Sequence, residues 1–256
     1  FFAHSGGGPV LSFYQALAEN GAAFSQGSHK LVQGTDELEN LPSIDGIIFV
    51  DAHPGNSVLV LRGLNPSVTT DDNPPDGDTL AELDPFNPDN GYNPSGPSRY
   101  SVEFRQRYYV AQAARMSRLI EKALEKQRLM EHGAYPYADN DIFLIPRGGP
   151  QSSGPGASAY LWLADPSIPE VMETASPAKL LRSDGSINIQ KIHSTMAVDR
   201  TLAARHATFD LGTKVLSVRS FLSANAIRAR DSLEAIDYDS SNNSTFAAVR
   251  RISVPV

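Results

Sequence analysis

Residues 1–9 read Phe1-Phe2-Ala3-His4-Ser5-Gly6-Gly7-Gly8-Pro9 and place one serine between an apolar pair and a run of glycines. The apolar pair is typical of a strand, and the apolar residues from Val10 to Ala18 recur at the spacing of one helix face. The predicted order is strand, very tight turn and helix, with the Ser5 hydroxyl at the turn. Small neighbouring residues tolerate a strained backbone that presents a nucleophile to substrate. Ser5 is therefore the candidate nucleophile.

The segments that follow predict an α/β sheet. Residues 9–20 are expected to be helical, with Pro9 in the first turn and Gly21 at the end. The apolar run 44–50 predicts a second strand, buried on both faces of a parallel sheet. It leads into Asp51-Ala52-His53-Pro54-Gly55, which is a loop at the carboxyl end of that strand. Open α/β sheets place their ligand-binding groups there.

Composition bounds the class of protein. The chain has 256 residues, 41% hydrophobic and 20% charged, which suits either one domain with a large insertion or two domains. A net charge of -7 argues against a nucleic-acid partner, because neutralising phosphates requires a basic face. No segment approaches the roughly 18 consecutive apolar residues of a membrane span. The chain has no cysteine, which excludes disulfides, thiolate metal sites and a cysteine nucleophile, and nothing in the sequence specifies a compartment.

The rest of the chain shows less specific patterns. Residues 71–92 are crowded with Pro, Asn and Asp, and we interpret them as a solvated lid loop, since a calcium loop with its closing glutamate is missing. Residues 99–132 carry the longest helical pattern, which Gly133 ends. Residues 214–218 predict a strand, and residues 247–256 are expected to lead into a final strand.

Each candidate site residue also has a structural interpretation. The glycine run has no P-loop lysine, and Leu11 stands where a dinucleotide-binding turn needs its third glycine. A turn that merely packs tightly or holds a phosphate stays an alternative. In a functional interpretation His53 lines the substrate pocket, or Asp51 and His53 join a metal site. We favour a structural one, in which Asp51 caps nearby backbone N–H groups and His53 packs. A metal is rejected because no third ligand has suitable spacing. His4 is expected to project away from the turn and to pack.

Ala3-His4-Ser5-Gly6-Gly7 resembles the nucleophile elbow of the α/β-hydrolase superfamily, in its Ala-x-Ser-x-Gly variant. Residues 252–256 resemble the strand that leads to the catalytic acid. Residues 51–55, 65–68 and 90–92 are similar to a branch of that superfamily with a large cap. The resemblance implies an α/β-hydrolase-type, mostly parallel sheet with a large, mainly helical cap. It divides the chain into a core at 1–61, a cap at 62–205 and a return to the core at 206–256.

The resemblance also implies a chemistry. A serine hydrolase of the esterase or lipase type would cleave an ester, amide or thioester through an acyl-enzyme on Ser5, with the Gly6 N–H in the oxyanion hole. His53 would line the substrate pocket, and no cofactor is expected. Aromatic residues of the cap would favour an apolar acyl or aromatic substrate; these are Phe86, Tyr92, Tyr100, Phe104 and Trp162.

The implied order of serine, acid and histidine places the last two beyond Val256. We therefore expect an internal piece of a longer protein, or one chain of a processed one. A companion chain or further segments would complete the sheet, and a homo-oligomer is compatible with this. Within the chain the substitutes are Asp199 or Asp210 with His193 or His206.

Two other classes of function stay open. One is a non-catalytic binding or scaffold protein of the same fold, whose elbow lacks a working triad. The other is a phosphate- or nucleotide-binding domain that uses Gly6 to Gly8, although no lysine stands near that loop.

Overall fold

The structure is a computed structural model that describes residues 1–67, 80–85, 87–93, 98–134, 142–146, 172–173, 178–181, 184–190, 193–194 and 213–256. Its helices are α1 (Gly7–Asn20), α2 (Asn56–Gly63), α3 (Val102–Glu131), α5 (Val218–Ser220), which runs into the π-turn η6 (Phe221–Asn225), and α6 (Thr245–Val249). Short 3₁₀ turns are η1 (Ala22–Ser25), η2 (Asp36–Leu38), η3 (Pro88–Asn90) and η7 (Tyr238–Ser240).

The described strands form pairs, of which one is parallel. That pair is β1 (Phe2–His4) with β2 (Ile48–Val50). The antiparallel pairs are β3 (Ile142–Pro146) with β8 (Thr213–Ser217), β4 (Met172–Glu173) with β7 (His193–Ser194), β5 (Ala178–Leu181) with β6 (Ile187–Gln190), and β9 (Arg228–Ala229) with β10 (Ile236–Asp237). The predicted elements at 9–20, 99–132 and 214–218 correspond to α1, α3 and β8, and Gly133 ends α3 with a φ of 64°.

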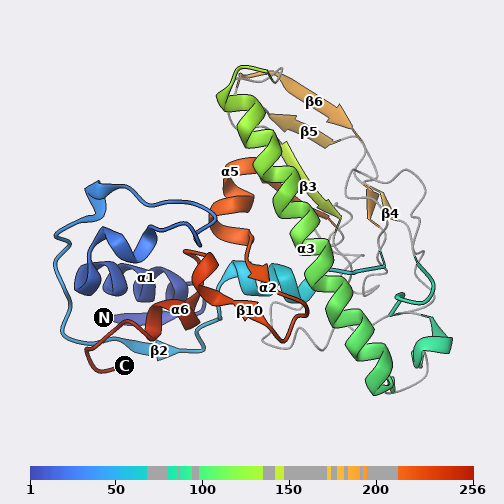
Figure 1. Ribbon diagram of the computed structural model, residues 1–256, viewed down its shortest axis with the longest axis horizontal. Helices are drawn as coiled ribbons and strands as arrows, with labels where there is room; N and C mark the ends of the chain where they lie inside the picture. The colour runs from blue at the N-terminus through green and yellow to red at the C-terminus, as the bar shows by residue number, and fades with distance from the viewer. Residues whose placement is uncertain are drawn as a thin grey trace.

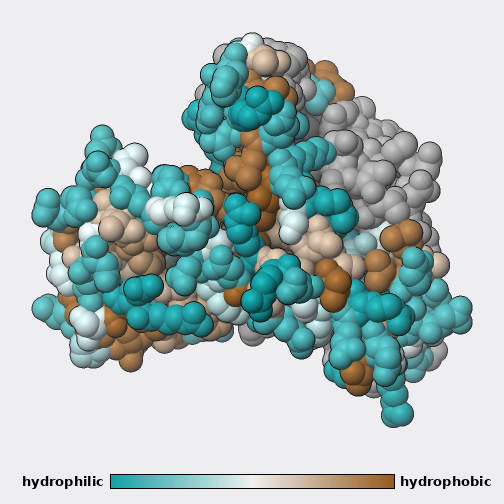
Figure 2. All heavy atoms as spheres, in the orientation of Figure 1, coloured by the Kyte–Doolittle hydropathy of each residue, from teal (hydrophilic) through white to brown (hydrophobic). Residues whose placement is uncertain are grey.

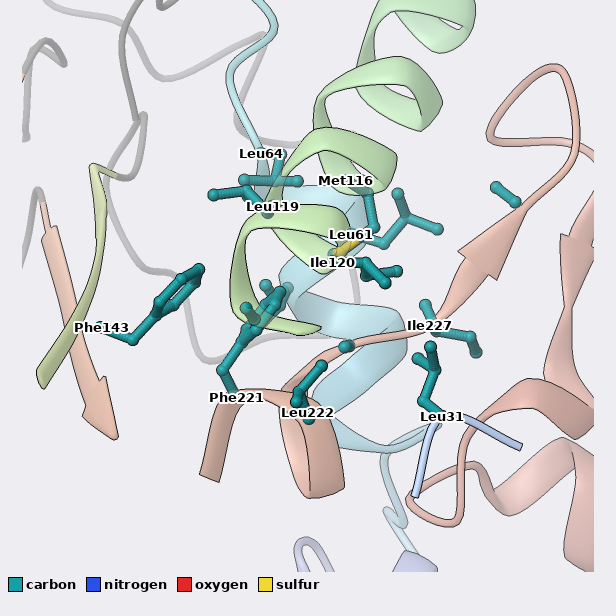
Figure 3. Packing of buried hydrophobic residues seen from close by; sticks show 14 of the residues in the cluster. Leu31, Leu61, Leu64, Met116, Leu119, Ile120, Phe143, Phe221, Leu222 and Ile227 are labelled. Carbon is teal, nitrogen blue, oxygen red and sulfur yellow. The ribbon is translucent and has the colours of Figure 1, made fainter. Parts of the chain in front are cut away.

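Both termini lie in the same part of the molecule, with α1, β2 and α6, while the long helix α3 crosses the opposite part (Figure 1). The main core lies between these parts, where α2 packs against α3 and the π-turn η6 (Figure 3). Phe143 of β3 stacks on Phe221 of η6 with ring centroids 4.7 Å apart. This cluster contains residues from each of the three segments expected as core, cap and return to the core. Leu61, Met116 and Ile227 all belong to it.

Polar side chains of α3 donate hydrogen bonds to the backbone carbonyls at the end of α2. The last carbonyls of a helix have no partner within it, and they need donors when they are buried. Gln112 donates to the carbonyls of Arg62 at 3.0 Å and Leu64 at 2.8 Å. Arg115, which is fully buried, donates to the carbonyl of Asn65 at 2.6 Å. The two residues therefore fix where the chain leaves α2.

The buried side of α1 differs from the predicted one. The sequence pattern put Val10 and Leu17 on one buried face, yet Val10 is exposed and Leu17 is buried with Ser12, Gln15 and Ala16. Gln15 explains the difference, because its side chain both accepts from the Ile44 N–H and donates to the Ile44 carbonyl. A polar residue thus takes a buried position because it satisfies a neighbouring stretch of backbone.

The second strand is shorter and less buried than predicted. β2 covers three residues of the run 44–50, and Ile48 is 61% exposed and Val50 39% exposed, so burial on both faces is wrong. The partner residue Phe2 on β1 is 63% exposed. Because side chains alternate across a strand, Ala3 faces α1 while these three share the outer face. Hydrophobic atoms accordingly reach the surface over this part of the molecule (Figure 2).

Residues 247–256, which were expected to lead into a final strand, have a different structure. Residues 245–249 form the helix α6, which packs on α1. The chain then passes β2 on the side away from β1, where the Ile47 N–H donates to the Pro255 carbonyl at 3.0 Å. The arrangement around β2 is therefore β1, β2 and an extended C-terminal segment.

In the part of the chain that the structure describes, no helix is long and apolar enough to cross a bilayer.

Candidate active site

The turn between β1 and α1 has a constrained backbone at its serine. Ser5 has a φ of 51°, in the left-handed region that costs a non-glycine residue about 1–2 kcal/mol. Three hydrogen bonds hold it there: its N–H donates to the Val50 carbonyl at 3.2 Å, and its carbonyl accepts from the N–H groups of Gly8 at 3.1 Å and His53 at 3.3 Å. The side chain is exposed. The turn thus carries local strain and presents a hydroxyl to solvent.

Small residues on either side of Ser5 let the helix lie close to the strands. A Cβ added at Gly7 would be 3.9 Å from the Cβ of Ala3, which is buried beneath the helix. A Cβ added at Gly8 would be only 2.6 Å from the Cβ of Ala52. Since real Cβ atoms do not approach so closely, position 8 requires glycine as long as Ala52 stays in place. The steric requirement for glycine is therefore at position 8, whereas a Cβ at position 7 would make an ordinary contact.

The start of α1 offers hydrogen-bond donors beside Ser5. The first N–H groups of a helix have no acceptor within it. The Gly8 N–H is used by the Ser5 carbonyl, which leaves the N–H groups of Gly6, the N-cap residue, and Gly7. The first turn contains no acidic side chain that would compensate the positive end of the helix dipole. Negative charge that develops near Ser5 would be stabilised here.

His53 comes to the same turn from the loop after β2. Its backbone N–H donates to the Ser5 carbonyl, and its Nε2 atom lies 3.4 Å from where a Cβ of Gly6 would stand. The other ring nitrogen, Nδ1, accepts from the Gly55 N–H at 3.1 Å. The side chain is partly buried, and this burial lowers the pKa of His53 below its ordinary value. The structure therefore brings the loop of His53 to Ser5 and the His53 ring to Gly6.

The loop that carries His53 is anchored by residues far away in the sequence. Thr245 donates through Oγ1 to the His53 carbonyl at 3.0 Å and through its N–H to the Pro54 carbonyl at 3.0 Å. Asn243 accepts from the Asn56 N–H at 2.7 Å. Gly55 has a φ of 113°, and a Cβ there would be 2.1 Å from the Asn243 carbonyl oxygen. Sequence reasoning missed Asn243 and Thr245, because nothing in their local pattern points to a loop almost 190 residues away.

Other candidate residues do not join this group. Asp51 has a φ of 48°, is exposed and makes no hydrogen bond with the described residues, so it does not form the expected cap. His4 is exposed, so the expected packing of its side chain is wrong. Among the side chains that the structure describes, no histidine hydrogen-bonds to a carboxylate. Asp199, His206 and Asp210 lie outside the described residues, and His193 is described only in its backbone.

Two of the aromatic residues proposed as a substrate lining pack together, and a third is buried. Tyr100 stacks on Phe104 with centroids 5.3 Å apart, and Tyr92 and Phe104 are buried. Phe86 and Trp162 lie outside the described residues, as do residues 71–79 of the expected lid. Within the described residues no group of acidic and histidine side chains is arranged to hold a metal ion.

Two cavities lie elsewhere. One of about 550 Å³ borders Ser117 of α3 and the β9–β10 hairpin, and another of about 230 Å³ borders Lys30, Asp239 and Arg251. Neither is lined by the Ser5 turn. Lys30 is 5% exposed, and its Nζ atom finds no hydrogen-bond partner among the described residues. It lies 4.8 Å above the Phe24 ring.

The Ser5 turn therefore combines an exposed hydroxyl, a positive φ, helix N–H donors and an adjoining imidazole. No protein-family model, curated protein or solved structure matches this chain.

Proposed function

We propose that the protein is a serine hydrolase of the α/β-hydrolase type, in which Ser5 attacks the carbonyl carbon of an ester, amide or thioester. The observation that carries the proposal is the backbone of Ser5. An exposed serine with a φ of 51°, held by three hydrogen bonds between a parallel strand pair and a helix start, has no evident structural reason to be serine. Glycine would adopt that φ without strain.

The reaction would follow the acyl-enzyme route. The Ser5 Oγ forms a bond to the carbonyl carbon, the carbonyl π electrons move to oxygen, and the hydroxyl proton passes to a general base. The N–H groups of Gly6 and Gly7 at the start of α1 support the negative oxygen. The resemblance assigns the base to a histidine that follows the catalytic acid in chain order, which is not a residue of the described site. Collapse of the intermediate expels the alcohol, amine or thiol, and water then releases the acid.

A fluorophosphonate probe tests this proposal, because it phosphonylates an activated serine. The protein is treated with the probe, and the modified peptide is identified by mass spectrometry. We expect an adduct on Ser5 that disappears in Ser5→Ala and persists in Ser28→Ala, which removes an exposed serine from an ordinary loop. Absence of an adduct on folded protein would contradict the proposal and favour a non-catalytic binding protein.

A further inference from the structure

The hydrogen bond between Gly55 and His53 determines which ring nitrogen of His53 carries the proton. A neutral imidazole has one N–H and one acceptor nitrogen. Nδ1 accepts from the Gly55 N–H at 3.1 Å, so it carries no proton. The single proton of the neutral ring is therefore on Nε2. The burial of the ring lowers the pKa of His53, which favours this neutral form at pH 7.

The same geometry decides against a role as general base. A base for Ser5 needs an unprotonated nitrogen toward the hydroxyl, with the other nitrogen donating to an orienting group. His53 shows the reverse arrangement, because the nitrogen toward the turn carries the hydrogen and the orienting group is a donor. Nε2 is also on the Gly6 side of the turn, 3.4 Å from the position of a Gly6 Cβ.

We propose that His53 is a catalytic residue that donates its Nε2–H to the oxyanion formed when Ser5 attacks a carbonyl, beside the Gly6 N–H. This inference rests on the proposed hydrolase function. A neutral donor suits the task, since it stabilises the developing charge and transfers no proton. Its ring is held in place by the backbone bonds from His53 to Ser5 and from Thr245 to His53.

The loop geometry explains why His53 can hold this orientation. Gly55 needs its positive φ to turn its N–H toward the ring, and the Asn243 carbonyl fills the space where a side chain would be. The imidazole is thus oriented by two backbone segments, without a carboxylate.

The test compares the rate of fluorophosphonate labelling of Ser5 in His53→Gln, His53→Ala and the unchanged protein, because the phosphoryl oxygen of the probe occupies the oxyanion position. The amide nitrogen of Gln stands close to the place of Nε2 and donates a hydrogen bond, and it cannot act as a base. We expect His53→Ala to label about 100-fold to 1,000-fold more slowly, the usual effect of losing one oxyanion donor. His53→Gln should stay within about 10-fold of the unchanged protein, on the reasoning that it keeps such a donor. His132→Ala, at the end of α3, is the matched control.

The outcomes separate the two proposals. If Ser5 is never labelled, the hydrolase function itself is wrong and His53 loses its role with it. If Ser5 is labelled and His53→Ala reacts at the normal rate, only the role of His53 is overturned. Equal losses in His53→Ala and His53→Gln would identify a base instead of a donor.

A second measurement tests the inference even if the His53→Ala protein fails to fold. Nitrogen-15 NMR of the histidine-labelled protein at neutral pH reports which ring nitrogen carries the proton, and His53→Gln identifies the signal. We expect a protonated Nε2 and an unprotonated Nδ1, and the opposite tautomer would overturn the inference.

Discussion

The close approach of α1 to the loop after β2 gives a quantitative prediction. In Gly8→Ala the new Cβ would stand 2.6 Å from the Cβ of Ala52, about 1 Å inside the normal contact distance of 3.5–4.0 Å. Such overpacking costs about 1–3 kcal/mol, and the better helix propensity of alanine offsets at most about 1 kcal/mol of it. We therefore expect Gly8→Ala to lower the free energy of unfolding by about 1–2 kcal/mol.

The second substitution, Ala52→Gly, removes the atom that clashes. By itself it should cost about 0.4–1 kcal/mol through the entropy of the unfolded chain. Combined with Gly8→Ala it should restore most of the stability, so the double-mutant cycle gives a coupling free energy of about 1–3 kcal/mol. Urea unfolding followed by circular dichroism measures all four proteins.

The neighbouring glycine supplies the control. Gly7→Ala places its Cβ 3.9 Å from that of Ala3, an ordinary contact, and should leave stability unchanged or raise it by up to about 1 kcal/mol. Additive effects of Gly8→Ala and Ala52→Gly would refute the reasoning, because they would show that the two Cβ atoms do not compete for space. A Gly7→Ala protein as unstable as Gly8→Ala would refute it as well.

Other features give further predictions. Gly55→Ala should destabilise the protein by more than Gly133→Ala in urea unfolding, since both have positive φ but only position 55 also meets backbone, 2.1 Å from the Asn243 carbonyl oxygen; equal losses would contradict this. Lys30→Met should keep or raise the melting temperature, because burial lowers the pKa of Lys30 and so disfavours its charged form. A loss of more than about 1 kcal/mol in the free energy of unfolding would show that the contacts of Lys30 with aromatic and acidic neighbours outweigh the cost of its burial. The pKa of His53 is lowered on folding, so its contribution to stability is present above pH 6.5 and declines as the pH falls below that value; His53→Gln should flatten this part of the pH–stability curve, and identical curves would contradict it.

The sequence predicted the local parts of the site because local sterics determine them. A serine between small residues at Ala3 and Gly7 is readable as a tight turn, and the structure gives Ser5 its positive φ there. The rule that open α/β sheets bind ligands at the carboxyl ends of their strands pointed to the loop that carries His53, but not to the position of its ring, and a packed turn was the favoured interpretation. The α/β-hydrolase fold as a whole stays a prediction, since the described sheet around Ser5 has only the β1–β2 pair and the C-terminal segment beside it.

The features that sequence reasoning missed depend on distant contacts. Gln15 is polar, and only its bonds to Ile44 reveal why it is buried. Residues 247–256 were expected to lead into a strand, yet Ser244 caps a helix there by accepting from the Ala247 N–H at 3.3 Å. The exposure of Ile48 could not be read from an apolar run, because periodicity does not tell which faces of a strand are covered.

The attachment of the C-terminal segment to α1 has a consequence for synthesis of the protein. Asn20 donates to the Arg251 carbonyl and Glu19 accepts from Ser253, which are contacts across 231 and 234 residues. At about 5–20 residues per second, a ribosome needs about 10–50 s to add that length of chain. During this interval α1 has emerged while the helix α6 that covers it does not yet exist. The surface of α1 on which α6 packs therefore stays uncovered for tens of seconds while the chain between them is made.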